Sequence, residues 1–237
     1  MCEINPAAGA RTYAARVTAG DLADRIRAAL RASADPTIAP GQQAYMKSAM
    51  PFLGVRVPAV RALVRRECRG VTDPIVLRAA ALDLWRAAEF REERYAATGV
   101  TGLRPLRARL DMLDVHEEMI RSGAWWDHVD EIAGRVGSVL REHPAEMNTL
   151  LRGWSSDPDL WVRRCAILAQ LGFGDATDRA LLTDVVVSNL ADAEFFIRKA
   201  IGWALRDLAR RDPDWVRAFA AEHPLSPLSR REAMKHL

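Results

Sequence analysis

The sequence of 237 residues contains few cysteines, no closely spaced histidines and no long apolar run. Its three cysteines are too few and too scattered for a disulfide framework. No two of its five histidines lie three or four positions apart, so a structural zinc site is not indicated. No stretch approaches the roughly 20 apolar residues that a transmembrane helix needs, and no apolar run follows a basic N-terminus as in a signal peptide. We therefore expect a cytoplasmic protein without a metal or cofactor.

The composition is that of a globular protein with an unusual choice of cation. Apolar residues make up 49% and charged residues 27%, which excludes a largely disordered chain. Only Lys47, Lys199 and Lys235 are lysines among the 34 cationic residues, so arginine supplies almost all of the positive charge. Arginine makes two-pronged contacts with phosphate. The net charge is only +3, however, and codon bias explains the arginine excess equally well.

Apolar residues recur every three or four positions along almost the whole chain, which is the pattern of amphipathic helices. Asp-Pro and His-Pro pairs separate these segments, because proline interrupts a helix or begins one. Residues 1–17 show little pattern, so we expect a frayed N-terminus and a single domain over residues 18–237. The predicted helices cover residues 21–33, 42–49, 58–69, 74–88, 91–98, 105–122, 126–142, 144–153, 159–171, 178–190, 194–211, 213–222 and 227–236.

An internal period of 35 residues runs through this helical pattern. Segments 157–164 and 192–199 are near copies at that offset. Large apolar residues recur at the same spacing, at Phe90, Trp125, Leu160 and Phe195 and again at Trp126, Trp161 and Phe196. A helical period of this length is typical of stacked antiparallel helix pairs, and HEAT-like repeats are favoured because the TPR consensus is absent. The sequence therefore predicts an all-α, curved α-solenoid with a concave face.

One carboxylate interrupts the repeat. Asp130 stands where the repeat otherwise has small apolar residues, Cys165 and Ala200. Trp126 lies one turn earlier and shares a helical face with Asp130. Asp127 is nearer the helix start and is the better candidate for capping, which weakens capping as the explanation for Asp130. The alternative is a core Trp126 with a surface Asp130, and we expect His128 to be exposed to solvent.

Cations recur along one face of the predicted stack. A tryptophan stands among three cations in one helical stripe, at Lys199, Trp203, Arg206 and Arg210. Arg94 and Arg164 occupy the position of Lys199 in earlier repeats. An exposed basic stripe is usually only a solvated face, but a tryptophan in its middle is unusual for such a face. Cations interleaved with an aromatic ring are typical of nucleic-acid binding, and the track predicts a basic cleft.

Several longer motifs follow one another in a characteristic order. They are Tyr45-Met46-Lys47, Pro51-Phe52-Leu53-Gly54-Val55, Trp125-Trp126-Asp127-His128-Val129-Asp130, Trp161-Val162-Arg163-Arg164, residues 194–206 and residues 228–233. Over roughly residues 42–237 the chain resembles the AlkD-like DNA alkylation repair glycosylases, which are built from HEAT-like helix pairs. It departs from them at Met50, where an aromatic residue is expected before Pro51.

The resemblance implies a monofunctional, metal-independent DNA glycosylase. Its substrates would be cationic alkylpurines such as 3-methyladenine and 7-methylguanine in duplex DNA. By the same resemblance Asp130 is the catalytic carboxylate, and Trp126 and Trp203 flank the sugar-phosphate of the lesion. Together with the cationic track, it predicts DNA contacts from Arg164, Lys199, Arg206, Arg94, Tyr45 and Lys47. We expect a monomer associated with the nucleoid.

These residue types suit the implied chemistry. A cationic base is already an activated leaving group, so a general acid is not required. A fixed carboxylate can stabilise an oxocarbenium-like sugar and position water, and indole faces favour cationic character. Two alternatives remain, because fold does not decide function. One is a non-catalytic HEAT-like protein that binds bent or branched DNA, and the other is a protein-interaction scaffold.

Overall fold

The computed structural model describes residues 17–237, and within that range it contains helices and no strand. The all-α prediction is thereby confirmed, whereas the predicted frayed N-terminus lies, except for Val17, outside the described residues. The helices are α1 (Ala19–Ala32), α2 (Ala39–Met46), α3 (Val57–Glu67), α4 (Pro74–Arg86), α5 (Arg91–Thr101), α6 (Leu113–Gly123), α7 (Trp126–Glu142), α8 (Pro144–Trp154), α9 (Leu160–Leu168), α10 (Arg179–Val187), α11 (Phe195–Ala209), α12 (Pro213–Glu222) and α13 (Pro227–Ala233). None of these helices is both long and apolar enough to span a bilayer.

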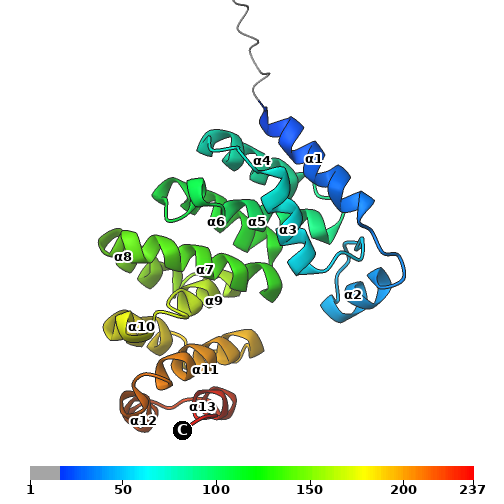
Figure 1. The fold of residues 1–237 in the computed structure, drawn as a ribbon. Helices are drawn as coiled ribbons and strands as arrows, with labels where there is room; N and C mark the ends of the chain where they lie inside the picture. Colours follow the sequence, from blue (N-terminus) through cyan, green and yellow to red (C-terminus); the bar gives the residue numbers. More distant parts are fainter. Residues whose placement is uncertain (1–16) are drawn as a thin grey trace, which may run out of the picture.

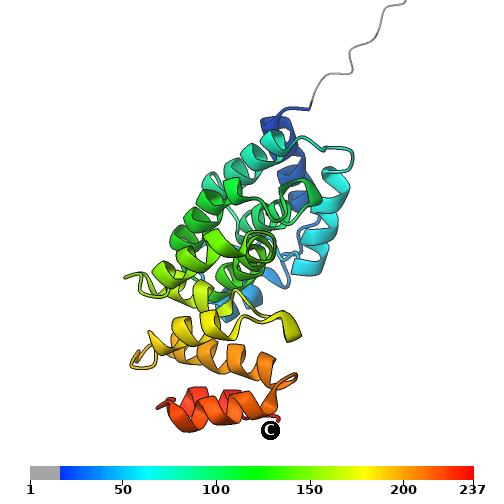
Figure 2. The same ribbon diagram turned by 90° about the vertical axis from the view of Figure 1, so that its left-hand side faces the viewer.

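The stack runs from α1 at one end to α13 at the other, while α2 lies to the side of it, level with later helices (Figures 1 and 2). Helices α5, α7, α9 and α11 form a row in which each one contacts the next. They begin at Arg91, Trp126, Leu160 and Phe195, within one residue of the 35-residue spacing. Helices α8, α10 and α12 each follow a member of this row and pack against it, along the left side of the stack in Figure 1. The 35-residue period is therefore the length of chain that makes up one layer of an α-solenoid.

Acidic residues before proline account for two helix starts. The side chain of Asp73 accepts a hydrogen bond from the backbone N–H of Ile75 and caps α4, whose first residue is Pro74. Asp212 caps α12 in the same way ahead of Pro213. Proline has no N–H to leave unpaired at this position, and such a side-chain cap contributes about 1 kcal/mol. These Asp-Pro pairs fix where two helices of the stack begin.

The predicted helix over residues 105–122 is wrong in its first half and confirmed in its second, where α6 runs. The chain there forms two short 3-10 turns, Arg104–Leu106 and Leu110–Met112, before α6 begins. Pro105 lies in the first of these turns, where it cannot donate a backbone hydrogen bond. Ala108 follows with a φ of 60°, a left-handed conformation that an α-helix cannot include. The helical spacing of apolar residues continues through this segment, but the backbone there is not helical.

A continuous apolar core lies between the layers and holds the row of helices together. At the repeat position of Asp130, Cys165 and Ala200 are fully buried, as expected. At Gly137 of α7 a Cβ atom would lie 2.2 Å from the carbonyl oxygen of Ala169, the residue that follows α9. A side chain there would push the two helices apart, so the glycine allows the helix with the unusual carboxylate to lie directly against the next layer.

Candidate active site

Asp130 on α7 is bound by an arginine from the next layer. The Nε and Nη2 atoms of Arg164 donate to its two carboxylate oxygens, each at 2.8 Å. The remaining Nη1 atom of Arg164 donates to the backbone carbonyl of Phe196 on α11. Arg164 is fully buried, whereas 23% of the Asp130 side chain is exposed. The pair therefore ties three layers of the stack together and leaves one edge of the carboxylate accessible.

Burial and the ion pair act on Asp130 in opposite directions. Burial raises the pKa of the Asp130 carboxyl above its ordinary value, because the ionised form loses hydration. The hydrogen bonds from Arg164 oppose this rise by favouring the ionised form. Arg164 is thus the group that favours the ionised form of this partly buried carboxyl.

Trp203 on α11 has three cations around its indole ring. The Cζ atom of Arg164 lies 5.5 Å from the ring centroid, the Nζ atom of Lys199 5.7 Å and the Cζ atom of Arg206 5.9 Å. These are cation–π distances, at which the negative face of the ring attracts the charge. Two cations of the predicted stripe, Lys199 and Arg206, therefore lie beside the tryptophan, and Arg164 joins them from the neighbouring helix.

A pocket of about 280 Å³ brings most of the predicted residues together. Its walls come from α2, α7, α9 and α11, and they are Tyr45, Trp126, Arg164, Phe195, Phe196, Lys199 and Trp203. Tyr45 and Phe195 are exposed at its surface, so aromatic rings from two distant parts of the chain face solvent there. The pocket is lined with aromatic rings and cations, and the Asp130 carboxylate is held by one of its wall residues.

The first turn of α7 is fixed by buried polar groups. Asp127 accepts hydrogen bonds from Arg91, at 2.7 and 3.2 Å, and from the hydroxyl of Tyr95 at 2.6 Å. Its carboxylate therefore anchors α7 to α5. His128 beside it is fully buried between the rings of Trp85 and Tyr95, so the prediction of an exposed histidine is wrong. Burial lowers the pKa of His128 to about 3, which keeps its ring neutral at physiological pH.

Three predicted DNA contacts lie outside the pocket walls, namely Arg206, which stays beside Trp203, and Arg94 and Lys47. Arg94 lies against the indole of Trp85, with its Cζ atom 4.8 Å from the ring centroid, and donates to the carbonyl oxygen of Ser122. Burial lowers the pKa of Arg94 from its ordinary value. Lys47 is exposed at the end of α2, two residues beyond Tyr45. The structure therefore separates Arg94 from the other cations of the predicted track.

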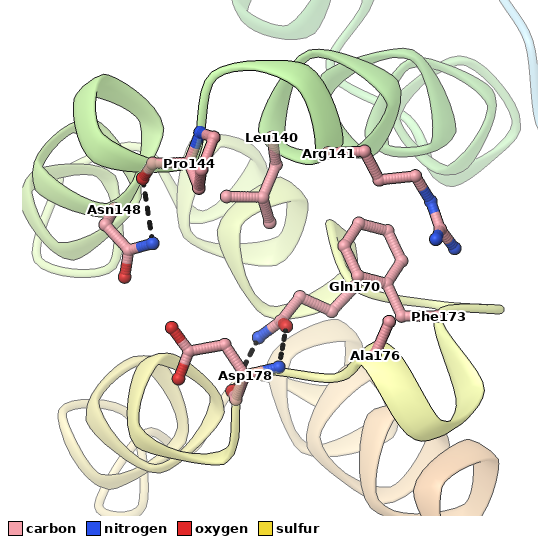
Figure 3. Close-up of a pocket in the computed structure, with 8 residues that line it drawn as sticks. All are labelled: Leu140, Arg141, Pro144, Asn148, Gln170, Phe173, Ala176 and Asp178. Atoms are coloured by element: carbon pink, nitrogen blue, oxygen red, sulfur yellow. Dashed lines mark hydrogen bonds between the residues drawn. The ribbon is translucent and has the colours of Figure 1, made fainter.

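A second pocket of about 270 Å³ lies at the far end of α7 (Figure 3). Its polar groups already bond within the protein: Asn148 donates to the carbonyl of Pro144, and Gln170 bonds to the backbone of Asp178. Arg141 lies over the ring of Phe173 at 3.7 Å. This pocket is about ten helical residues, roughly 15 Å, from Asp130 along α7 and contains none of the predicted site residues.

Comparisons of the whole sequence and fold identify the family of this chain. A model of the family of DNA alkylation repair enzymes matches residues 26–237. The chain belongs to this family. A solved structure from Enterococcus faecalis, described as a predicted DNA alkylation repair enzyme, is 29% identical and has a TM-score of 0.79. The alignment covers 86% of this chain and 96% of that one. Among curated proteins no match is found.

Family membership confirms the resemblance drawn from the sequence motifs and supports a role in DNA repair. Sequence reasoning had missed Phe195 and Phe196 as walls of the pocket, although both fall at the aromatic position that repeats every 35 residues. It had also missed Glu232, which binds both Lys199 and Arg206. Glu232 lies in the last matched motif, but nothing in its spacing indicates partners on another helix. In the described part of the chain, no three His, Cys, Asp or Glu side chains gather as a metal site needs.

Proposed function

We propose that this DNA alkylation repair enzyme is a monofunctional DNA glycosylase that needs no metal. It hydrolyses the N-glycosidic bond of cationic alkylated purines, such as 3-methyladenine and 7-methylguanine, in duplex DNA. The observation that carries the proposal is the Asp130 carboxylate, which is partly exposed and bound by an arginine of the aromatic pocket. Family membership supports the DNA substrate.

In the proposed reaction, the bond between the sugar and the purine breaks and its electron pair neutralises the cationic base. The sugar becomes oxocarbenium-like, and the negative charge of Asp130 stabilises it while water attacks the anomeric carbon. The water releases its proton to the carboxylate or to solvent. The indoles of Trp126 and Trp203 flank the sugar, where their faces favour positive charge by about 0.5–2 kcal/mol each.

DNA contacts are proposed for the six residues that the sequence indicated. Lys199 and Arg206 lie beside Trp203, and Tyr45 forms the exposed lip of the pocket next to Lys47. Arg164 has five N–H donors, and three of its nitrogen atoms already donate within the protein. Only its remaining N–H groups can therefore bind a phosphate. Arg94 contacts the DNA from outside the pocket. One monomer supplies the whole set.

A protein that only binds bent or branched DNA is the second candidate. An isolated carboxylate in a cleft would repel a phosphate backbone, but Asp130 and Arg164 form a pair with no net charge. The cleft therefore also fits a binder without catalysis. The two candidate functions therefore have to be distinguished by base release and not by DNA affinity.

The deciding experiment is single-turnover release of 7-methylguanine from methylated duplex DNA by wild-type protein and Asp130→Asn. Loss of a preorganised charge should lower the rate about 100- to 1,000-fold. Asp184→Asn is the matched control, because Asp184 pairs with Arg152 on the surface, away from the pocket. An unchanged rate in folded Asp130→Asn would refute the role of the carboxylate. Salt-dependent DNA binding by a wild-type protein that releases no base would favour the binder.

A further inference from the structure

The C-terminal helix α13 sends one side chain to the cations around Trp203, and the mechanism above gives it no role. Glu232 binds the Nζ atom of Lys199 at 2.7 Å through one carboxylate oxygen. Its other oxygen accepts from the Nη1 atom of Arg206 at 2.8 Å. Only 13% of the Glu232 side chain is exposed. One carboxylate thus joins two cations that stand two helical turns apart on α11.

Helix α13 lies unusually close to the helix that carries Trp203. A Cβ atom at Gly202 would lie 2.4 Å from the Cβ atom of Glu232 and 2.9 Å from the carbonyl oxygen of Ser229. The buried hydroxyl of Ser229 also donates to the carbonyl of Arg198 on α11, at 2.9 Å. The absence of a side chain at position 202 therefore allows the contact, and the backbone at Glu232 has little room to move.

The bonds to Glu232 leave most donors of both cations free. Lysine has three N–H donors and arginine five, and the structure shows one bond from each to the carboxylate. The same head groups lie within 6 Å of the indole centroid of Trp203. A DNA phosphate can therefore bind the remaining N–H groups while Glu232 still holds both cations beside the ring.

We propose that Glu232 is a positioning residue, which binds Lys199 and Arg206 together and thereby fixes both head groups beside the indole of Trp203. The inference rests on the proposed glycosylase function. Without the carboxylate the two like charges repel each other, and neither head group is held beside the indole. Glu232 touches no reacting atom, so its effect reaches the reaction only through Trp203 and the phosphate contacts.

The test is Glu232→Gln, which keeps the shape of the side chain and removes its charge. The maximal single-turnover rate of 7-methylguanine release should fall about tenfold, equivalent to about 1.4 kcal/mol. The dissociation constant for methylated duplex DNA should stay the same or decrease, because a negative charge has left a phosphate-binding surface. A slower reaction with undiminished binding is the expected signature.

Two further variants control for general damage. Glu118→Gln neutralises a glutamate that pairs with Arg86 away from the pocket, and it should match wild type. Ser229→Ala loosens the contact of α13 with α11 without changing the charge at Glu232. A contrary result is the same decrease in melting temperature and the same decrease in rate in Ser229→Ala and Glu232→Gln. In that case the docking of α13 on α11 alone explains the result, and the inference is wrong.

Two other outcomes of the Glu232→Gln experiment also overturn the inference. One is a wild-type maximal rate, and the other is weaker DNA binding with an unchanged maximal rate, which would make Glu232 an affinity residue. Absence of base release by the wild-type protein is distinguishable from both, because it refutes the glycosylase proposal itself and the inference with it.

Discussion

Replacing Arg164 with lysine should move the acid limb of the excision rate to higher pH. Arg164 donates to both oxygens of Asp130, and its hydrogen bonds oppose the rise in pKa that burial imposes on this carboxyl. A lysine keeps the charge but is a single point that cannot copy the planar fork. The pKa of Asp130 therefore rises further in Arg164→Lys. Because the proposed reaction needs the ionised carboxylate, activity is full above that pKa and is lost as pH falls through it.

The stability of Arg164→Lys should fall as well. The lysine loses at least one hydrogen bond to a charged partner, a loss of about 1.5–3 kcal/mol. In a chain of this size each kcal/mol changes the melting temperature by about 2–4 °C, so a decrease of about 3–12 °C is expected. Thermal unfolding therefore has to be measured first, and the excision assay run well below the transition of the variant.

The assay is the single-turnover rate of 7-methylguanine release across the neutral and acidic range, with spontaneous release from protein-free DNA subtracted. Arg152→Lys is the control, because Arg152 pairs with Asp184 on the surface. Its acid limb should coincide with that of wild type. The opposing outcome is an acid limb of Arg164→Lys that also coincides with that of wild type although the melting temperature of the variant has dropped. The hydrogen bonds would then have been lost without changing the pKa that controls the rate, and the reasoning about Asp130 would fail.

Two further predictions concern packing and salt dependence. Gly137→Ala should lower the melting temperature by about 2–12 °C, since the added methyl group meets the carbonyl of Ala169 and overpacking costs about 1–3 kcal/mol. Gly134→Ala, where nothing lies within 4 Å of the new methyl group, should be neutral or stabilising, and equal destabilisation of both variants would contradict the packing argument. In DNA binding, Lys199→Gln should reduce the slope of log affinity against log salt by about 0.9. Arg94→Gln should reduce that slope by less than Lys199→Gln does, because Arg94 lies against Trp85 outside the pocket, and an equal or larger reduction would contradict this ranking.

The order of helices was predictable from the sequence because each one has an apolar face and an identifiable start. The segment 126–142 was predicted with its observed bounds, and the 35-residue period gave the row of helices from α5 to α11. The failure at residues 105–122 has a local cause. Periodicity records which residues can face a core, but it does not record the left-handed backbone at Ala108.

The sequence was sufficient to predict which residues form the candidate site, but not which of them contact one another. Asp130 was identifiable because it breaks a repeat, and Trp203 because it stands among cations. The partner of Asp130 was not identifiable, since a 35-residue offset places Arg164 in the next layer without giving the direction of its side chain. His128 was mispredicted for a related reason. A histidine is tolerated in a core when aromatic rings surround it, and those rings come from α4 and α5, distant in the sequence.

The site is assembled across three successive layers, with Asp130 on α7, Arg164 on α9 and Trp203 on α11. This arrangement restricts how such a chain can change length during evolution. A duplicated repeat added before α1 or after α13 would lengthen the stack and leave the three residues as neighbours. A repeat inserted between α7 and α11 would place a whole layer between the carboxylate and its partners. Length variation among descendants of this chain should therefore be confined to its two ends.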